Sequence, residues 1–241
     1  MTPFTLVEGR LLRRYKRFLA DCEIPDHGLI TAHCPNPGSM KTLIDGEPVA
    51  WLRHVDDRNR KLPWTLTLIE VRRGRKALVD TSLPNQIVAD GILAGKVSSV
   101  AGFEHLRREV RIGQGTRLDI VLGDQERPDE STGEVFIEVK NVTMLSSKDL
   151  KRADFPDSVT ERGRKHLEVL TKLADRGKRA VLFLLLGRTD CSKVGFADDI
   201  DPAYCDALEK AVEAGVEILS HRVRVRSGKF SLGEMVPVEL P

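Results

Sequence analysis

Three charged residues interrupt two apolar, strand-like segments of the chain. Asp119 lies in residues 117–122, whereas Glu138 and Lys140 lie in residues 135–140. Side chains alternate across a strand, so Glu138 and Lys140 share one face, and Asp119 can join that face if the two strands pair. Buried charges are expensive unless they are paired or bound to a metal. We therefore expect these three residues to act together.

The chemistry that suits this set is metal-assisted cleavage of a phosphodiester. Two carboxylates about 4 Å apart repel by roughly 4 kcal/mol at an effective dielectric of about 20, and a divalent cation would reverse the repulsion. Oxygen ligands favour a hard cation such as Mg²⁺ or Mn²⁺. We therefore predict Asp119 and Glu138 as metal ligands and Lys140 as the ammonium beside the attacking water. The pattern is short, and a simple ion pair between Glu138 and Lys140 on an exposed strand is the alternative.

A second group of candidates is basic and lies near the N-terminus. Arg13, Arg14, Tyr15 and Arg17 belong to a segment that interleaves cations with aromatic rings. Cations can contact backbone phosphates and bases can stack on the rings, which is how small barrels hold single strands of nucleic acid. The alternative is an ordinary barrel strand, with its cations in solvent and its rings in the core.

A third basic group follows the predicted start of a helix at Ser158. Arg162, Arg164 and Lys165 are placed there so that backbone N–H groups and side-chain cations could meet the same phosphate. A solvated helix face is the alternative, because acidic residues lie nearby. The helix follows soon after the segment with Glu138 and Lys140, so it could reach the same substrate.

The whole chain has the composition of a globular protein without membrane spans. It has 241 residues, of which 41% are hydrophobic and 31% charged, and no apolar run approaches the roughly 20 residues that cross a bilayer. The N-terminus lacks the features of a secretion signal, so we expect a cytoplasmic protein. Four widely spaced cysteines predict buried, reduced thiols rather than a zinc site or a disulfide scaffold. The net charge of +2 does not by itself indicate a nucleic-acid binder.

Strand and helix patterns divide the chain into two parts. Short strands with turn signals between them are expected up to residue 80, which is typical of a small β-barrel. We place the domain boundary after residue 82, giving domains of residues 1–82 and 83–241. The first part contains predicted strands at 6–22, 29–34, 48–53, 64–71 and 76–80.

The second part has mixed α/β order. Strands and helices alternate, and residues 180–186 form a fully apolar strand. An acidic segment at 124–134 is predicted to be an exposed loop. The remaining predicted strands are 107–112, 117–122, 134–142, 216–219 and 222–226, and the predicted helices are 85–93, 158–175 and 204–214.

Three stretches of the sequence resemble a known family. They are residues 33–40 (HCPNPGSM), 138–143 (EVKNVT) and 155–167 (FPDSVTERGRKHL). Together they closely resemble the sugar fermentation stimulation protein A (SfsA) family, and the resemblance covers nearly the whole chain. Pro37 stands where the family more often has Thr, which removes a hydroxyl from a turn-rich loop that contains His33 and Asn36.

The resemblance implies a fold and a set of roles. It implies an α/β (α+β) two-domain chain with an N-terminal OB-like β-barrel, followed by a PD-(D/E)xK nuclease-like α/β domain. It also implies DNA binding and a link to bacterial sugar metabolism. Separately, the turn-rich residues 33–40 suit a close backbone approach to a ligand, so we predict that His33 and Asn36 bind nucleic acid; a structural or exposed His33 is the alternative. By motif, Asp119 and Glu138 would be the metal carboxylates and Lys140 the water-positioning ammonium, with Glu109 or Asn85 as accessory groups.

Three functions remain open at this point. The first is a DNA-binding protein, with RNA as a further partner, whose C-terminal domain is a Mg²⁺-dependent phosphodiesterase. The second is a non-catalytic DNA-binding regulator of sugar fermentation genes that keeps the nuclease-like scaffold. The third is an enzyme acting on sugar phosphates, which the absence of a glycine-rich phosphate loop disfavours. The oligomeric state is left open.

Overall fold

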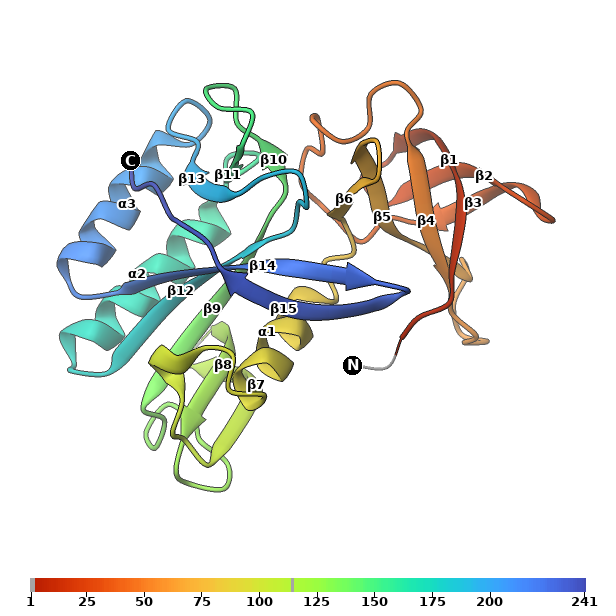
Figure 1. The fold of residues 1–241 in the computed structure, drawn as a ribbon. Coiled ribbons are helices and arrows are strands. Elements are labelled where there is room, and N and C mark those ends of the chain that lie inside the picture. Colours follow the sequence, from red (N-terminus) through yellow and green to blue (C-terminus); the bar gives the residue numbers. More distant parts are fainter. Residues whose placement is uncertain (1–2, 114) are drawn as a thin grey trace.

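The computed structural model describes residues 3–113 and 115–241, and the chain forms two lobes joined by a short connection (Figure 1). The N-terminal lobe is a β-barrel and the C-terminal lobe is a sheet covered by helices. The predicted boundary between residues 82 and 83 falls in the connection between β6 (Arg75–Leu78) and α1 (Pro84–Leu93). None of the described helices is long and apolar enough to cross a bilayer.

The barrel is a sheet that closes on itself. Its strand order is β3-β2-β1-β4-β5-β6, and β3 also pairs with β5 through His33 and Thr65. This single pairing covers the edge of β3, and β6 lies beyond β5 at the other end of the sheet. Its core is made of small and aliphatic side chains that are fully buried, such as Leu52 and Leu66. The other strands are β1 (Leu6–Tyr15), β2 (Leu19–Ile24), β3 (Gly28–His33), β4 (Val49–His54) and β5 (Trp64–Arg72).

The predicted single strand over residues 6–22 is wrong, because the chain turns sharply at residues 16–18. Lys16 and Arg17 adopt positive φ angles of 48° and 64°, and Phe18 begins the return. No Gly, Asn or Pro stands at this turn to signal it. Consequently Arg17 lies at an exposed turn rather than on a strand.

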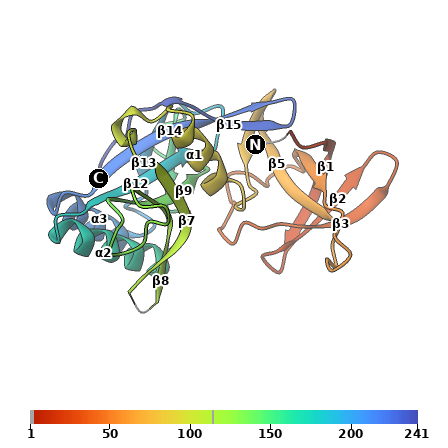
Figure 2. The ribbon, with the colours of Figure 1, turned by 90° about the horizontal axis from the view of Figure 1, so that it is seen from below.

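The C-terminal lobe is built on a six-stranded mixed sheet of order β15-β14-β12-β9-β8-β7. The three central strands β9, β12 and β14 are parallel, and the strands outside them run antiparallel. Figure 2 shows α1 on the opposite side of this sheet from α2 and α3. The elements are η1 (Ser98–Val100), β7 (His105–Ile112), β8 (Thr116–Gly123), β9 (Val135–Val142), α2 (Glu161–Asp175), β12 (Arg179–Leu186), α3 (Pro202–Glu213), β14 (Glu217–Arg226) and β15 (Lys229–Met235).

The sheet separates two hydrophobic cores, and β12 contributes to both. Leu182 and Leu184 pack under α2 and α3, whereas Val181 and Phe183 pack under α1. This alternation explains why the strand is apolar at every position, as central strands covered on both faces usually are. All four cysteines are buried and free, which confirms the predicted reduced thiols.

The sequence patterns missed several strands and misplaced two helix starts, since α3 begins at Pro202 rather than Tyr204. β14 is one continuous strand rather than two, β15 was not predicted, and α2 begins at Glu161 rather than Ser158. The true cap of α2 is Thr160, whose hydroxyl accepts the Gly163 N–H at 3.0 Å. A small unpredicted sheet of order β10-β11-β13 contains β10 (Met144–Leu145), β11 (Arg152–Phe155) and β13 (Lys193–Phe196).

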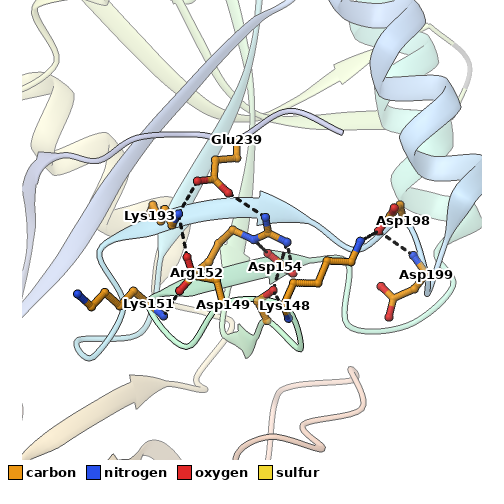
Figure 3. A network of polar contacts seen from close by, with 10 residues as sticks. Lys148, Asp149, Lys151, Arg152, Asp154, Lys193, Asp198, Asp199 and Glu239 are labelled. Carbon is orange, nitrogen blue, oxygen red and sulfur yellow. Dashed lines mark hydrogen bonds and ion pairs between the residues drawn. The ribbon is translucent and has the colours of Figure 1, made fainter.

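A network of ion pairs holds this small sheet against the C-terminal end of the chain (Figure 3). Arg152 pairs with Asp154 at 2.7 Å and with Glu239 at 2.8 Å. Lys193 bridges Asp149 at 2.8 Å and the same Glu239. The network fixes β11, and therefore the segment between β11 and α2.

The two lobes are joined by a buried arginine. Arg188 follows β12 and is 2% exposed. Its guanidinium donates to both carboxylate oxygens of Asp190, at 3.0 and 2.9 Å, and to the Thr143 carbonyl at 3.0 Å. It also donates to the hydroxyl of Thr42 in the barrel, at 3.4 Å. This side chain therefore ties the barrel to the ends of two central strands.

Replacing Arg188 with Met should destabilise the protein by about 3–5 kcal/mol, because the buried Asp190 carboxylate would lose its partner. The free energy of unfolding in urea measures the effect. The double variant Arg188→Met, Asp190→Leu should recover much of the loss, because it removes the unpaired charge. A loss below about 1 kcal/mol in the single variant would contradict the proposed anchor.

Candidate metal and nucleic-acid site

The residues of the D…ExK pattern meet where β8 and β9 separate. The β8–β9 pairing runs only from Leu122–Val135 to Ile120–Ile137. Beyond it, the Val139 N–H donates to the Asp119 carboxylate at 2.7 Å instead of to a strand carbonyl. Asp119 is thus fixed across the gap, beside the strand that carries Glu138.

An irregularity in β8 turns Asp119 into this gap. Leu118 packs in the core under α2 and α3, whereas Ile120 packs in the core under α1. Residues two apart share a face in a regular strand, so β8 is distorted at Asp119. On the paired strand β7, Glu109 has a positive φ of 55°. Asn85 of α1 donates to Asp119 at 2.6 Å and to Glu109 at 3.2 Å, so both predicted accessory groups lie at the site.

Glu138 is the most buried charged group of the site, with 2% of the residue exposed. Its Oε1 accepts a bond from the Lys140 ammonium at 2.6 Å and contacts Nδ1 of His166 on α2. Burial alone would raise the pKa of Glu138, but the Lys140 charge and the His166 contact together lower it below its ordinary value. Glu138 is therefore ionised, and its second oxygen, Oε2, is buried with no hydrogen-bond partner among the described residues.

Asp119 has the opposite electrostatic balance. Burial raises the pKa of Asp119 to about 7, and repulsion from the Glu138 carboxylate adds to the shift. The Val139 N–H, the Lys140 charge and the Asn85 amide act in the other direction. Asn85 holds Asp119 from the α1 side of the sheet and His166 holds Glu138 from the α2 side, so the two carboxylates approach the gap between β8 and β9 from opposite faces.

The helices α2 and α3 add two residues that the sequence did not assign to the metal site. His166 contacts Glu138 from α2, and the Tyr204 hydroxyl of α3 is buried with no partner among the described residues. Burial raises the pKa of Tyr204, and the nearby Glu138 carboxylate adds to it, so this phenol stays protonated. Only the helical position of His166 beside an apolar stripe could have indicated that it faces the sheet.

A cleft of about 450 Å³ lies between the two lobes beside this site; Lys140 and Asn85 line it, whereas Asp119 and Glu138 do not. The barrel contributes Arg17 and a loop that contains Asn36, whereas β9 contributes Lys140. The start of α2 contributes Arg162. The cleft therefore brings together residues from three predicted groups: the charged strand residues, the cations of the barrel and the cations at the start of α2.

Other predicted barrel residues are engaged within the barrel. Arg13 pairs with Asp21 at 2.7 Å and lies over the Tyr15 ring, whose hydroxyl also donates to Asp21. Arg14 donates to the Asn36 carbonyl at 2.8 Å. These contacts hold the barrel surface and the loop in place, and the nucleic-acid roles of Arg13, Arg14 and Tyr15 stay predictions.

The remaining candidates divide between surface and structural positions. His33 stacks against Phe18 at a ring separation of 6.4 Å. Arg164 pairs with the buried Asp201 at 3.0 Å, which links α2 to α3. Lys165 is exposed on α2 outside the cleft lining. Of the nine predicted nucleic-acid-binding residues, the structure brings Arg17, Asn36 and Arg162 to the cleft lining and leaves the other six outside it.

Two family models match this chain. The SfsA N-terminal OB domain matches residues 12–79, and the sugar fermentation stimulation protein RE domain matches residues 82–229. The chain belongs to the SfsA family. This confirms the family resemblance and the two-domain fold, with an OB barrel followed by an α/β domain.

Relatives in the SfsA family align over nearly their full length. The sugar fermentation stimulation protein homolog of Pseudomonas aeruginosa is 45% identical over 236 residues, covering 98% of this chain and 97% of the relative. The homolog of Jannaschia sp. is 42% identical over 238 residues, covering 98% and 96%. The structure of Pyrococcus furiosus SfsA in complex with Ca²⁺ has a TM-score of 0.84 at 24% identity, covering 99% of this chain and 100% of that one. At that identity, the match shows the shared fold.

The raised pKa of Asp119 predicts how stability depends on pH in the absence of divalent metal. The folded state holds this proton up to about pH 7, whereas an unfolded Asp releases it near 3.8. The free energy of unfolding should therefore fall as pH rises from 4 to 8, by at most about 4 kcal/mol at 1.4 kcal/mol per unit.

Asp119→Asn should remove that part of the pH dependence. In EDTA, the variant should be more stable than the parent at pH 8, and the difference should vanish near pH 4. Urea unfolding at the two pH values measures it, and comparison with the parent cancels the groups that both proteins share. A constant difference at both pH values would contradict the raised pKa of Asp119.

Proposed function

We propose that this protein binds DNA in the cleft between its lobes and hydrolyses phosphodiesters with Mg²⁺ or Mn²⁺ at Asp119, Glu138 and Lys140. The observation that supports this most is the free Oε2 of Glu138. An ionised carboxylate oxygen that is buried without a partner is costly. A cation beside Asp119 would satisfy it and relieve the repulsion between the two acids.

The donor set fits a hard cation. Asp119 and Glu138 would hold it, and Mg²⁺ usually takes one or two protein carboxylates and keeps several waters. The described residues contain no cluster of three or more acidic, His or Cys side chains that could hold a metal, so water and substrate oxygens would complete the shell. The Pyrococcus furiosus relative was solved in complex with Ca²⁺, another cation with oxygen ligands.

Side chains of the protein would supply the catalytic roles that the ion does not. The bound ion supplies Lewis acidity and a more acidic water. Lys140, whose side chain is 16% exposed, reaches the cleft and orients the attacking water or neutralises charge that develops on the phosphoryl oxygens. His166 holds the Glu138 carboxylate in position from the helix side.

Nucleic-acid binding rests on cations at the cleft. Arg17 and Arg162 are exposed, line the cleft from opposite lobes, and make no ion pair among the described residues. Such cations suit backbone phosphates of DNA or RNA. Lys165 lies one turn further along α2 and extends the positive surface.

The alternative is a non-catalytic DNA-binding regulator of sugar fermentation genes. The family name links these proteins to sugar fermentation. The Lys140 ammonium bound to Glu138 would then only neutralise a buried acid. This alternative predicts the same salt-dependent DNA binding without any turnover.

Lys140→Met separates these functions. The variant should bind DNA within about twofold of the parent, because Lys140 is mostly buried, and should lose cleavage by about 100-fold or more. Labelled single-stranded, duplex and branched DNA with Mg²⁺, Mn²⁺ or EDTA provides the assay. Equal Mg²⁺-dependent cleavage by variant and parent would remove the assignment of Lys140. Binding without cleavage by either protein would favour the regulator.

The position of Arg162 predicts a specific change in salt dependence. Arg162→Ala should reduce the slope of log affinity against log salt by about 0.7 for single-stranded DNA, the value for one lost phosphate contact. Lys172→Ala, an exposed cation near the other end of α2 and outside the cleft lining, should leave the slope unchanged. Equal effects of both substitutions would mean that Arg162 has no special role in nucleic-acid binding.

A further inference from the structure

The barrel side of the cleft is closed by one loop, residues 35–40. At one end of the loop, the Thr81 hydroxyl of the interlobe connection donates to the Pro35 carbonyl at 2.8 Å. At the other end, the Met40 N–H donates to the Asp157 carboxylate at 3.4 Å, just before α2. The loop therefore spans from the connection to the opposite wall of the cleft.

Hydrogen bonds and a close backbone contact hold this loop in place. Arg14 donates to the carbonyls of Asn36 and Ser39, at 2.8 and 3.4 Å, and the Asn36 side chain accepts the Gly38 N–H at 2.8 Å. A Cβ on Gly38 would lie only 2.2 Å from the Asp157 carboxylate. The backbone of the loop thus packs directly against the far wall.

Among the described residues, residues 39–43 pack against the C-terminal lobe without a water-sized channel between them. The space between the loop and the strands of the C-terminal lobe, lined by Met40, Thr42, Thr143 and Asp157 among others, is too small for a water molecule. Thr42 also accepts the Leu145 N–H at 3.0 Å, which closes the same seam. A nucleic-acid chain that enters the cleft has no exit on this side.

The cleft is the size of a small-ligand site. Its volume of about 450 Å³ is within the range of about 300–1,000 Å³ for sites that bind one small ligand. Phe155 and Val159 offer apolar surface for a base, and Arg17 and Arg162 line the cleft as exposed cations. Lys140 reaches the cleft, so the phosphate to be cleaved must enter it.

We propose that the cleft accepts the free end of a single nucleic-acid strand, and that the 35–40 loop blocks a continuous strand. This inference rests on the proposed phosphodiesterase function and specifies its substrate. When a phosphate lies beside Lys140, the nucleic-acid strand on one side of it extends out of the cleft into solvent. The 35–40 loop then blocks the chain on the other side, which in this proposal ends within the cleft. Water adds to the phosphorus and the adjoining P–O bond breaks, so a short terminal fragment is released and its oxygen takes up a proton.

The test compares a linear single-stranded oligonucleotide with the same sequence closed into a circle. With Mg²⁺, the parent protein should shorten the linear strand from one end and cut the circle at least 100-fold more slowly. In Lys140→Met, the circle should bind at least tenfold more weakly than the linear strand. A duplex with a single-stranded overhang should be cut in preference to a blunt duplex.

The outcomes separate this inference from the proposed function. Comparable cutting of the circle and the linear strand would overturn the end requirement and leave the phosphodiesterase intact. If neither is cut, the phosphodiesterase fails, and binding by Lys140→Met decides the end requirement: equal affinities for circle and linear strand overturn it.

Arg14→Met tests the loop as the barrier. It removes the guanidinium that holds residues 36–39, so the ratio of linear to circular cleavage should fall at least tenfold. Arg10→Met is the matched control on the same strand, because Arg10 pairs with Glu23 and Glu47 and does not contact the loop. An unchanged ratio in Arg14→Met would remove the loop from the account.

Discussion

The structure of the site depends on an ionised carboxylate that the fold buries almost completely. Glu138 stays charged because Lys140 and His166 both contact one of its oxygens, while the other oxygen is left without a partner among the described residues. Desolvation of such a group is tolerated only when its charge is compensated. The neighbouring Asp119 offers no positive charge to compensate Glu138, and burial with repulsion from Glu138 raises the pKa of Asp119 to about 7.

The barrel is fixed to the C-terminal lobe and forms one wall of the cleft beside the site. Arg188 ties Thr42 of the barrel to Thr143, one residue beyond the end of β9. The same barrel region then contributes a loop wall to the cleft. Fixing the lobes together in this way gives the cleft a defined shape before any ligand arrives, which lowers the ordering cost of binding.

Much of this could be predicted from the sequence, and the failures have physical causes. Asp119 and Glu138 could be found because charges stand out in apolar strands. The contact between His166 and Glu138 could not, because it joins a helix to a strand across 28 residues. The turn at Lys16 lacks the residues that usually mark one, so two strands read as one. Arg14 looked like a surface cation, although its hydrogen bonds go to a loop that only tertiary structure brings near.

The central claim is that Asp119 and Glu138 together hold a divalent cation. Anomalous scattering from crystals of the protein soaked in Mn²⁺ tests it most directly. We expect a single strong peak within coordination distance of Glu138 Oε2 and an Asp119 oxygen, and no peak at this position in crystals of Glu138→Gln. A parent structure with no peak there, in which the Tyr204 hydroxyl donates to Oε2 instead, would contradict the account.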